Sequence, residues 1–149
     1  MPYPHSAAHG YDKDFYAWAI HNAEMIRHGN LSEIDLENVA EEIESMGRSN
    51  KRELINRLAV LFAHLLKWQF QSERRSNSWK YTIEEQRFEL KDLLKESPSL
   101  KHEIEEQVNH AYLKALLIAT KETGFPRETF PKRCPFSLKQ ALNELFFPK

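Results

Sequence analysis

Cysteine is scarce in this sequence: Cys134 is the only one among 149 residues. A single cysteine excludes any disulfide within the chain, and one thiolate cannot form a zinc cage. No histidine lies close to Cys134 in the sequence, so the pattern does not indicate a cysteine–histidine catalytic pair. The sequence therefore does not favour a function based on disulfide, thiolate–zinc or catalytic cysteine chemistry.

Glycine is also rare, with only 4 residues, whereas hydrophobic residues make up 41% and charged residues 29% of the chain. A β barrel or sandwich would need many more glycine-bearing turns, so this composition favours a helical protein. No window approaches the roughly eighteen continuous apolar residues of a membrane span. The N-terminus lacks the apolar core of a secretory signal. We therefore expect a cytoplasmic location.

Charge of one sign is not in excess, because the formal net charge is −1. This balance disfavours binding to nucleic acid or anionic membranes through bulk electrostatics, although it is compatible with a local basic patch. The charges are unevenly distributed, however. Residues 33–44 hold six carboxylates and no base, whereas residues 48–91 hold ten Lys or Arg against five Asp or Glu. We expect the acidic segment to complement Arg48, Lys51 and Arg52.

Metal-ligating patterns are weak. Glu-x-x-His, the spacing of ferritin-like sites, does not occur in the chain,. His21, Glu24 and His28 share a helical face at a spacing that zinc accepts, but this face points away from the apolar side, which is typical of an exposed polar surface. His5 and His9 are four residues apart near the N-terminus. The sequence therefore predicts no metal site.

Apolar residues recur at helical spacing along most of the chain. Gly29, Gly47 and Gly124 follow three of these segments, and glycine is a common residue at helix C-termini. We expect helices over about residues 12–28, 35–46, 49–70, 79–96, 98–123 and 137–145. The inner faces of the first two would consist of Phe15, Trp18, Ala19, Asn22 and Ile26, and of Leu36, Val39, Ala40, Ile43 and Met46.

The helices predict an all-α bundle with five to six members in a single domain over residues 12–149, preceded by a flexible tail over residues 1–11. The helix over 49–70 is apolar around most of its circumference and is expected to be the hub. Three prolines in "FPRETFPKRCPF", residues 125–136, predict an extended C-terminal strap whose phenylalanines are buried against the bundle,.

Four segments together carry a specific pattern: "YDKDFYAWAIHNAEMIRHGNLSEIDLENVAEEIESMGRSNKREL", "HLLKWQFQSERRSNSWKYTIEEQR", "SPSL" and "ETFPKRCPFSLKQAL". They cover nearly the whole chain, which resembles the bacterial domain of unknown function 29 family. The resemblance implies an all-helical fold, and it brings no established activity with it. The matching segments include the polar residues His64, Lys67, Gln69, Arg75, Ser78, Gln86 and Arg87.

His64 lies in an apolar stretch, "RLAVLFAHLLKWQFQ" at residues 57–71. A buried imidazole needs a partner or a ligand, because burying it unpaired costs free energy. In the following helix Gln86 interrupts an apolar stripe. If the loop over 72–78 reverses the chain, His64 faces Gln86. At 100° per residue, His64 belongs to a polar seam made of Asn56, Arg57, Val60, His64, Lys67 and Gln71.

Two interpretations of this histidine remain open. In the structural one, His64 and Gln86 are hydrogen-bonded to each other and determine the register of the two helices. In the functional one, a small pocket holds His64 as an acid, base or ligand group, flanked by Lys67 and Arg87.

The basic loop at residues 74–80 is a second candidate. Arg74 and Arg75 precede a helix N-terminus, whose free N–H groups and dipole attract anions, and Ser76 and Ser78 add hydroxyls. A phosphate, a carboxylate or an acidic partner would fit there. The alternative is a solvated loop, or one that pairs with the acidic segment.

The sequence supports two function hypotheses. The first is a small cytoplasmic binding or interaction module that recognises a protein or an anion. The second is an enzyme or nucleic-acid-processing protein that uses His64 with Lys67, Arg75 and Arg87. No P-loop, dinucleotide turn or serine elbow is present, so no cofactor is predicted and enzymatic activity is left open. A membrane partner is not expected, nucleic acid is disfavoured and a homo-oligomer is compatible with the sequence. The candidate polar site consists of His64, Lys67, Arg75, Ser78, Gln86 and Arg87.

Overall fold

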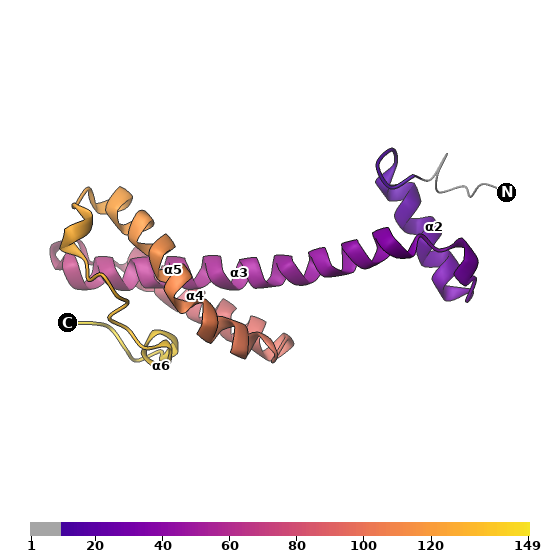
Figure 1. Cartoon of the computed structure of the whole chain (residues 1–149). Coiled ribbons are helices and arrows are strands. Elements are labelled where there is room, and N and C mark those ends of the chain that lie inside the picture. The colour runs from indigo at the N-terminus through magenta and orange to yellow at the C-terminus, as the bar shows by residue number, and fades with distance from the viewer. Residues whose placement is uncertain (1–9) are drawn as a thin grey trace. The chain divides into compact units, whose positions relative to one another are not determined.

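The computed structural model describes residues 10–149, which contain five α-helices, three short 3-10 turns and no strand. The predicted all-α fold is confirmed. None of these helices is long and apolar enough to cross a membrane. The helices are α2 (Phe15–Arg27), α3 (Leu36–Phe70), α4 (Asn77–Glu96), α5 (Leu100–Thr123) and α6 (Leu138–Leu142) (Figure 1).

The described residues divide into two compact units, one up to Arg48 and the other from Ser49 onward, which we describe separately. The single domain over 12–149 and the tail over 1–11 stay predictions. His5 and His9 lie outside the described residues.

In the N-terminal unit, α2 begins after Asp14, whose side chain accepts a hydrogen bond from the backbone N–H of Ala17 at 3.1 Å. The helix ends before Gly29, which takes the positive φ of 70° that favours glycine,. The indole Nε1 of Trp18 donates to the Asp35 carboxylate at 2.8 Å. The Asn22 side chain accepts from the backbone N–H of the same aspartate at 2.7 Å. These bonds join α2 to the start of α3.

α3 continues through Gly47, where the sequence predicted the end of one helix and a second helix from Ser49. That prediction was wrong. Gly47 does not have the positive φ of Gly29 and Gly124, the two helix-ending glycines. A glycine inside a helix costs only about 1 kcal/mol relative to alanine, and no proline stops the strong helix formers on either side.

The apolar faces of the N-terminal unit are less covered than the sequence predicted. Trp18 and Asn22 are buried as expected, but Phe15 and Ile26 are about half exposed. On α3, Leu36 is 63% exposed and Ile43 is 59% exposed. Among residues 10–48, α2 and a short turn are the neighbours available to this part of α3, and two helices cannot enclose the apolar sides of both.

The C-terminal unit has its core around the second half of α3, as predicted. The contacts of Arg57 with Gln86 and of Lys67 with Trp79 show that α4 runs antiparallel to α3. α5 then runs parallel to α3 (Figure 1). The fully buried side chains of the three helices include Leu54, Leu58, Leu61, Phe62, Leu65, Leu66, Ile83, Leu90, Ala111 and Ala115.

The segment after α5 packs on this core through aromatic rings. Phe130 and Phe136 are buried, and Phe125 is partly buried. The Phe130 ring centroid lies 5.6 Å from that of Phe70. A 3-10 turn over Arg127–Thr129 is the only helical element between α5 and α6 in the described chain. The interpretation of residues 125–136 as an extended strap stays a prediction.

Candidate functional site

His64 is partly buried on α3, and its Nδ1 lies 2.9 Å from the backbone carbonyl oxygen of Val60. The predicted hydrogen bond to Gln86 was wrong. A carbonyl only accepts, so Nδ1 carries the proton in this contact. Burial lowers the pKa of His64, and the charge of Lys67 lowers it further, while the Val60 carbonyl acts in the opposite direction. The Glu122 carboxylate also acts in the opposite direction, and the net effect favours the neutral form of the imidazole.

The register of the α3–α4 hairpin explains this difference. α3 ends at Phe70 and α4 begins at Asn77, so the turn is centred earlier than the loop predicted over 72–78. The two helices are consequently offset by about one helical turn from the predicted pairing. Arg57 of α3, rather than His64, reaches Gln86: its Nη1 donates to the Gln86 Oε1 at 3.3 Å.

Lys67 is buried and already paired. Its Nζ donates to the Glu122 carboxylate of α5 at 2.6 Å. The same ammonium lies 4.6 Å from the centre of the Trp79 ring on α4. Lys67 thus connects three helices of the C-terminal unit, and its charge is compensated on one side by a carboxylate and on the other by an aromatic face.

Arg87 is buried, with 1% of its surface exposed, and it holds the C-terminal segment. Its Nε donates to the carbonyl of Ala141 at 2.6 Å and its Nη2 to that of Phe146 at 2.7 Å. The guanidinium also lies 5.3 Å from the Phe147 ring centre. Burial lowers the pKa of Arg87.

The basic loop is organised by the chain itself. Arg75 donates from Nε to the carbonyl of Trp68 at 2.7 Å and stacks over that ring at 5.0 Å. Ser76 caps α4 by accepting from the backbone N–H of Trp79 at 3.3 Å. Ser78 is exposed, and its carbonyl accepts from Thr82. Arg74, also exposed, is the loop arginine that has no such bond within residues 10–149. An anion at this helix N-terminus would therefore depend on Arg74.

The predicted polar set is thus not gathered into one site. His64 and Lys67 lie on α3, Arg75 and Arg87 bind carbonyls of the chain, and Gln86 lies in a separate groove.

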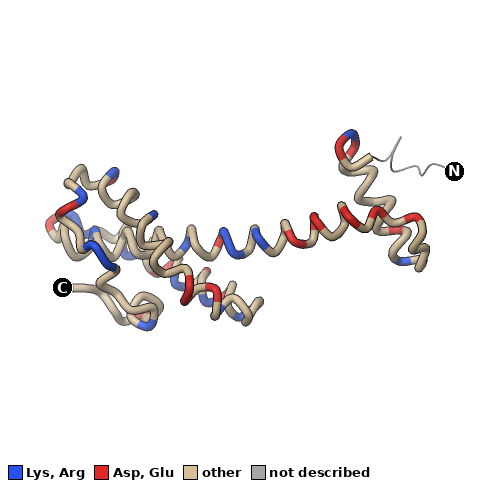
Figure 2. Tube along the Cα trace, viewed as in Figure 1, with Lys and Arg blue, Asp and Glu red and all other residues tan. Residues whose placement is uncertain are grey.

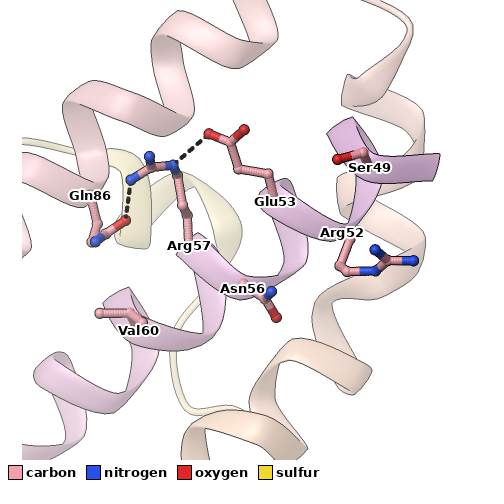
Figure 3. A pocket seen from close by; sticks show the side chains of 7 residues that line it. All are labelled: Ser49, Arg52, Glu53, Asn56, Arg57, Val60 and Gln86. Carbon is pink, nitrogen blue, oxygen red and sulfur yellow. Dashed lines mark hydrogen bonds and ion pairs between the residues drawn. The ribbon is translucent and has the colours of Figure 1, made fainter. Parts of the chain in front are cut away.

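This groove, which we call the α3–α4 groove, has a volume of about 390 Å³. The Glu53 carboxylate accepts from Arg57 Nε at 2.8 Å, and Arg57 in turn donates to Gln86, so the three side chains form a row across it (Figure 3). Ser49 and Arg52 lie at one end and Gln86 at the other (Figure 3). The groove is lined by Ser49, Arg52, Glu53, Asn56, Arg57, Val60 and Gln86.

Sequence reasoning had placed Asn56, Arg57 and Val60 on the polar seam, and Gln86 among the candidate residues, but it did not connect them as a groove. Ser49 and Arg52 were missed as lining residues. Their spacing could have identified them. Ser49, Arg52 and Asn56 follow one another at intervals of three and four residues, so they lie on the same face of α3 as the polar seam.

The acidic segment pairs in part as predicted. Arg48 lies 2.8 Å from Glu41 and 3.6 Å from Glu44, all on the exposed surface. Lys51 instead pairs with Glu103 of α5 at 3.0 Å. Figure 2 shows the resulting contrast, with acidic residues in the first part of α3 and basic residues further along it.

The remaining candidates for chemistry are the metal-ligating side chains and the thiol of Cys134. Within residues 10–149, no three His, Cys, Asp or Glu side chains are grouped so that they would hold a metal ion. The Cys134 thiol donates to the carbonyl of Phe136 at 3.3 Å. Burial raises the pKa of Cys134 to about 11, so the nucleophilic thiolate is disfavoured at neutral pH,.

The comparisons with known proteins give a family but no activity. The sequence pattern of the family described as Domain of unknown function DUF29 matches residues 11–147. Neither the comparison with curated proteins nor that with solved structures found a match.

Proposed function

This chain belongs to the DUF29 family, and we propose that it is a protein-interaction module whose N-terminal unit binds a cationic amphipathic helix of a partner protein. The observation that carries the proposal is the number of large apolar side chains that this small unit leaves exposed. Eight of them lie at least 47% exposed: Phe15, Tyr16, Ile20, Ile26, Leu31, Leu36, Ile43 and Met46.

Single exposed apolar residues are common on proteins, but a concentration of them on one small unit is typical of an interaction surface. On α3, Leu36, Val39, Ile43 and Met46 follow the alternating spacing of three and four residues that a partner helix recognises,. A helix laid against this stripe would supply the neighbour that a two-helix unit lacks.

The charge of the unit favours a basic partner. Residues 10–48 contain nine Asp or Glu against three Lys or Arg, which gives a net charge of −6. Such a field attracts a cationic helix and disfavours a second copy of the same unit, because like charges would be brought together. A cytoplasmic location is part of this proposal.

The enzyme hypothesis receives less support, because its residues have other partners. Lys67 is paired with Glu122, while Arg75 and Arg87 bind backbone carbonyls. His64 is directed to the Val60 carbonyl. A catalytic group must reach a substrate, and these contacts engage Lys67, Arg75 and Arg87 in the fold, while His64 is engaged through Nδ1.

The test is a titration of the full chain with a labelled synthetic peptide that forms a helix with leucine on one face and lysine on the other, followed by fluorescence anisotropy. A scrambled peptide of the same composition and a glutamate version of the helix serve as peptide controls. We expect binding of the lysine helix alone, weakened by added salt because part of the attraction is between exposed charges.

The test pair is Leu36→Ser with Ile43→Ser. The matched control is Leu113→Ser with Leu117→Ser, which changes two leucines on α5 that are also at least half exposed. We expect the first pair to lower peptide affinity about tenfold or more and the second to leave it unchanged. Equal loss in both pairs would contradict the proposal. A large drop in melting temperature in the Leu36→Ser, Ile43→Ser variant would also contradict it, because it would mean that the chain covers this face itself. A wild-type dimer that dissociates in this variant would contradict it as well, because the occupant would then be a second copy of the chain.

A further inference from the structure

We propose that the partner helix bound by the N-terminal unit carries basic residues seven positions apart along one edge of its apolar face, where they pair with Glu37 and Glu44 of α3. This charge pattern rests on the function proposed above and specifies which helices the unit accepts. The apolar side of α3 that the partner covers, which we call the α3 stripe, consists of Leu36, Val39, Ile43 and Met46.

A seven-residue repeat places carboxylates on both sides of the α3 stripe. Residues 35–37 read "DLE" and residues 42–44 read "EIE". Successive residues of a helix are rotated by about 100°, so the residue before each apolar position lies on one edge of the stripe and the residue after it lies on the other edge. Each edge therefore holds two carboxylates about 10 Å apart along the helix axis.

The edge formed by Asp35 and Glu42 is occupied by the N-terminal unit itself. The Asp35 carboxylate accepts from the indole Nε1 of Trp18 at 2.8 Å and from the side chain of Asn38 at 2.9 Å. The Tyr11 hydroxyl donates to the Glu42 carboxylate. Both acidic residues are partly buried. This edge is thus engaged in contacts with α2 and with the residues that precede it.

The edge formed by Glu37 and Glu44 is open to solvent, since both residues are exposed. Arg48 lies 3.6 Å from Glu44, but it lies closer to Glu41, at 2.8 Å. This side of the helix thus carries three carboxylates and one arginine and keeps a net negative charge. Ion pairs this exposed are weak, so the arginine does not prevent Glu44 from facing a second cation. A docked helix would meet negative charge along this edge.

Small residues separate this open edge from the α3 stripe. Ala40 and Gly47 are exposed and also lie seven positions apart, and a Cβ built at Gly47 has no atom within 4 Å. A lysine or arginine of the partner can therefore lay its aliphatic stem over these positions and bring its charge to a carboxylate. Helices that pack nearly aligned keep the same rise per residue, so basic residues seven apart match the spacing of the two carboxylates.

Two synthetic peptides of identical composition test this pattern. Both are helix-forming, with a leucine face on an alanine-rich background, and both carry two lysines. In the one-edge peptide the lysines lie seven positions apart on the same edge of the leucine face, and in the split-edge peptide they lie on opposite edges. In either chain direction along α3, the split-edge peptide can bring only one lysine to the edge of Glu37 and Glu44.

Affinities for the full chain are measured by fluorescence anisotropy at low ionic strength. We expect the one-edge peptide to bind about three- to fivefold more tightly, because it gains one further exposed ion pair. The variant Glu37→Gln with Glu44→Gln should lose this preference. The matched control, Asp12→Asn with Glu24→Gln, removes the same charge from exposed residues of the N-terminal unit outside this edge and should retain the preference.

A charge reversal provides a second test. The variant Glu37→Lys with Glu44→Lys should prefer a one-edge peptide in which glutamate replaces lysine over the corresponding split-edge peptide. Because each comparison uses peptides of equal charge, a change in the overall field of the unit does not produce this preference. Melting temperatures confirm that each variant is folded.

The outcomes separate the charge pattern from the function on which it rests. Equal affinity of the one-edge and split-edge peptides for the wild type would overturn the pattern and leave helix binding intact. A preference that survives in Glu37→Gln with Glu44→Gln, or that disappears in the control variant, would also overturn it. If neither peptide binds, both the pattern and the helix-binding function are wrong.

Discussion

The guanidinium of Arg87 in α4 lies against the backbone of Ala141 in α6, where its Nε donates to the carbonyl oxygen over 2.6 Å. The same group donates to Phe146 at 2.7 Å. An arginine has five N–H donors spread over a planar fork and can bind carbonyls that lie apart, whereas a lysine has three donors on a single nitrogen. This contact explains why the largest fully buried side chain of the described residues is a charged one.

Arg87→Lys is therefore expected to destabilise the protein although it keeps the charge. The lysine would leave buried carbonyls of the C-terminal segment unpaired, and we expect a loss of about 2–4 kcal/mol in the free energy of unfolding. Urea unfolding followed by circular dichroism measures this. Arg74→Lys on the exposed loop is the control and should change stability by no more than about 0.5 kcal/mol. Equal effects of both substitutions would refute the role given to Arg87.

Gly47→Ala is expected to stabilise the protein by about 0.5–1 kcal/mol, because alanine has the higher helix propensity. A Cβ built at Gly47 has no atom within 4 Å, so the methyl group has space. Gly124→Ala provides the contrast: its φ of 74° is strained for alanine, and we expect destabilisation,. Thermal unfolding of the two variants checks both signs. A destabilised Gly47→Ala would argue against an unbroken α3.

His64 predicts a dependence of stability on pH. Its pKa is lowered in the folded state, mainly by burial, so the unfolded chain binds the proton more readily,. The contribution is fully present above the unfolded pKa of about 6.5 and is lost as the pH falls below it toward the folded pKa. His64→Asn, which keeps a side-chain N–H donor, should remove this slope from a series of unfolding curves. His110→Asn, on the exposed side of α5, should retain it. If both variants keep the wild-type profile, another group is responsible.

The Lys67–Glu122 pair is expected to show a favourable coupling in a double-mutant cycle with Lys67→Met and Glu122→Gln. Lys67 is 7% exposed at its side chain but Glu122 is 44% exposed, so solvent screens part of the attraction,. We expect a coupling of about 0.5–1 kcal/mol that decreases with added salt. Strictly additive single effects would mean that Lys67 is held by Trp79 and packing rather than by the carboxylate.

The sequence by itself determined the helical fold and the position of most helices, because the signals that begin and end a helix are local. Ser76, in the basic loop, caps α4 by accepting a hydrogen bond from the backbone N–H of Trp79. Gly29 and Gly124 were expected at helix ends, and both adopt a positive φ. The apolar spacing also identified the hub over residues 49–70, since the period of 3.6 residues depends on the helix alone. The helix end predicted at Gly47 was wrong because the free-energy cost of one glycine inside a helix is small compared with the summed helix propensity of the residues around it.

Only the tertiary structure decided which polar residues meet. Whether His64 or Arg57 reaches Gln86 depends on where the turn between α3 and α4 is centred, and a difference of a few residues moves a side chain by a full helical turn. Arg87 binds carbonyls more than fifty positions away in the chain, a relationship that no periodicity encodes. Local hydrogen bonds and side-chain spacing can be read along a sequence, whereas contacts between distant segments depend on the geometry of the connections between helices, and the sequence constrains that geometry only weakly.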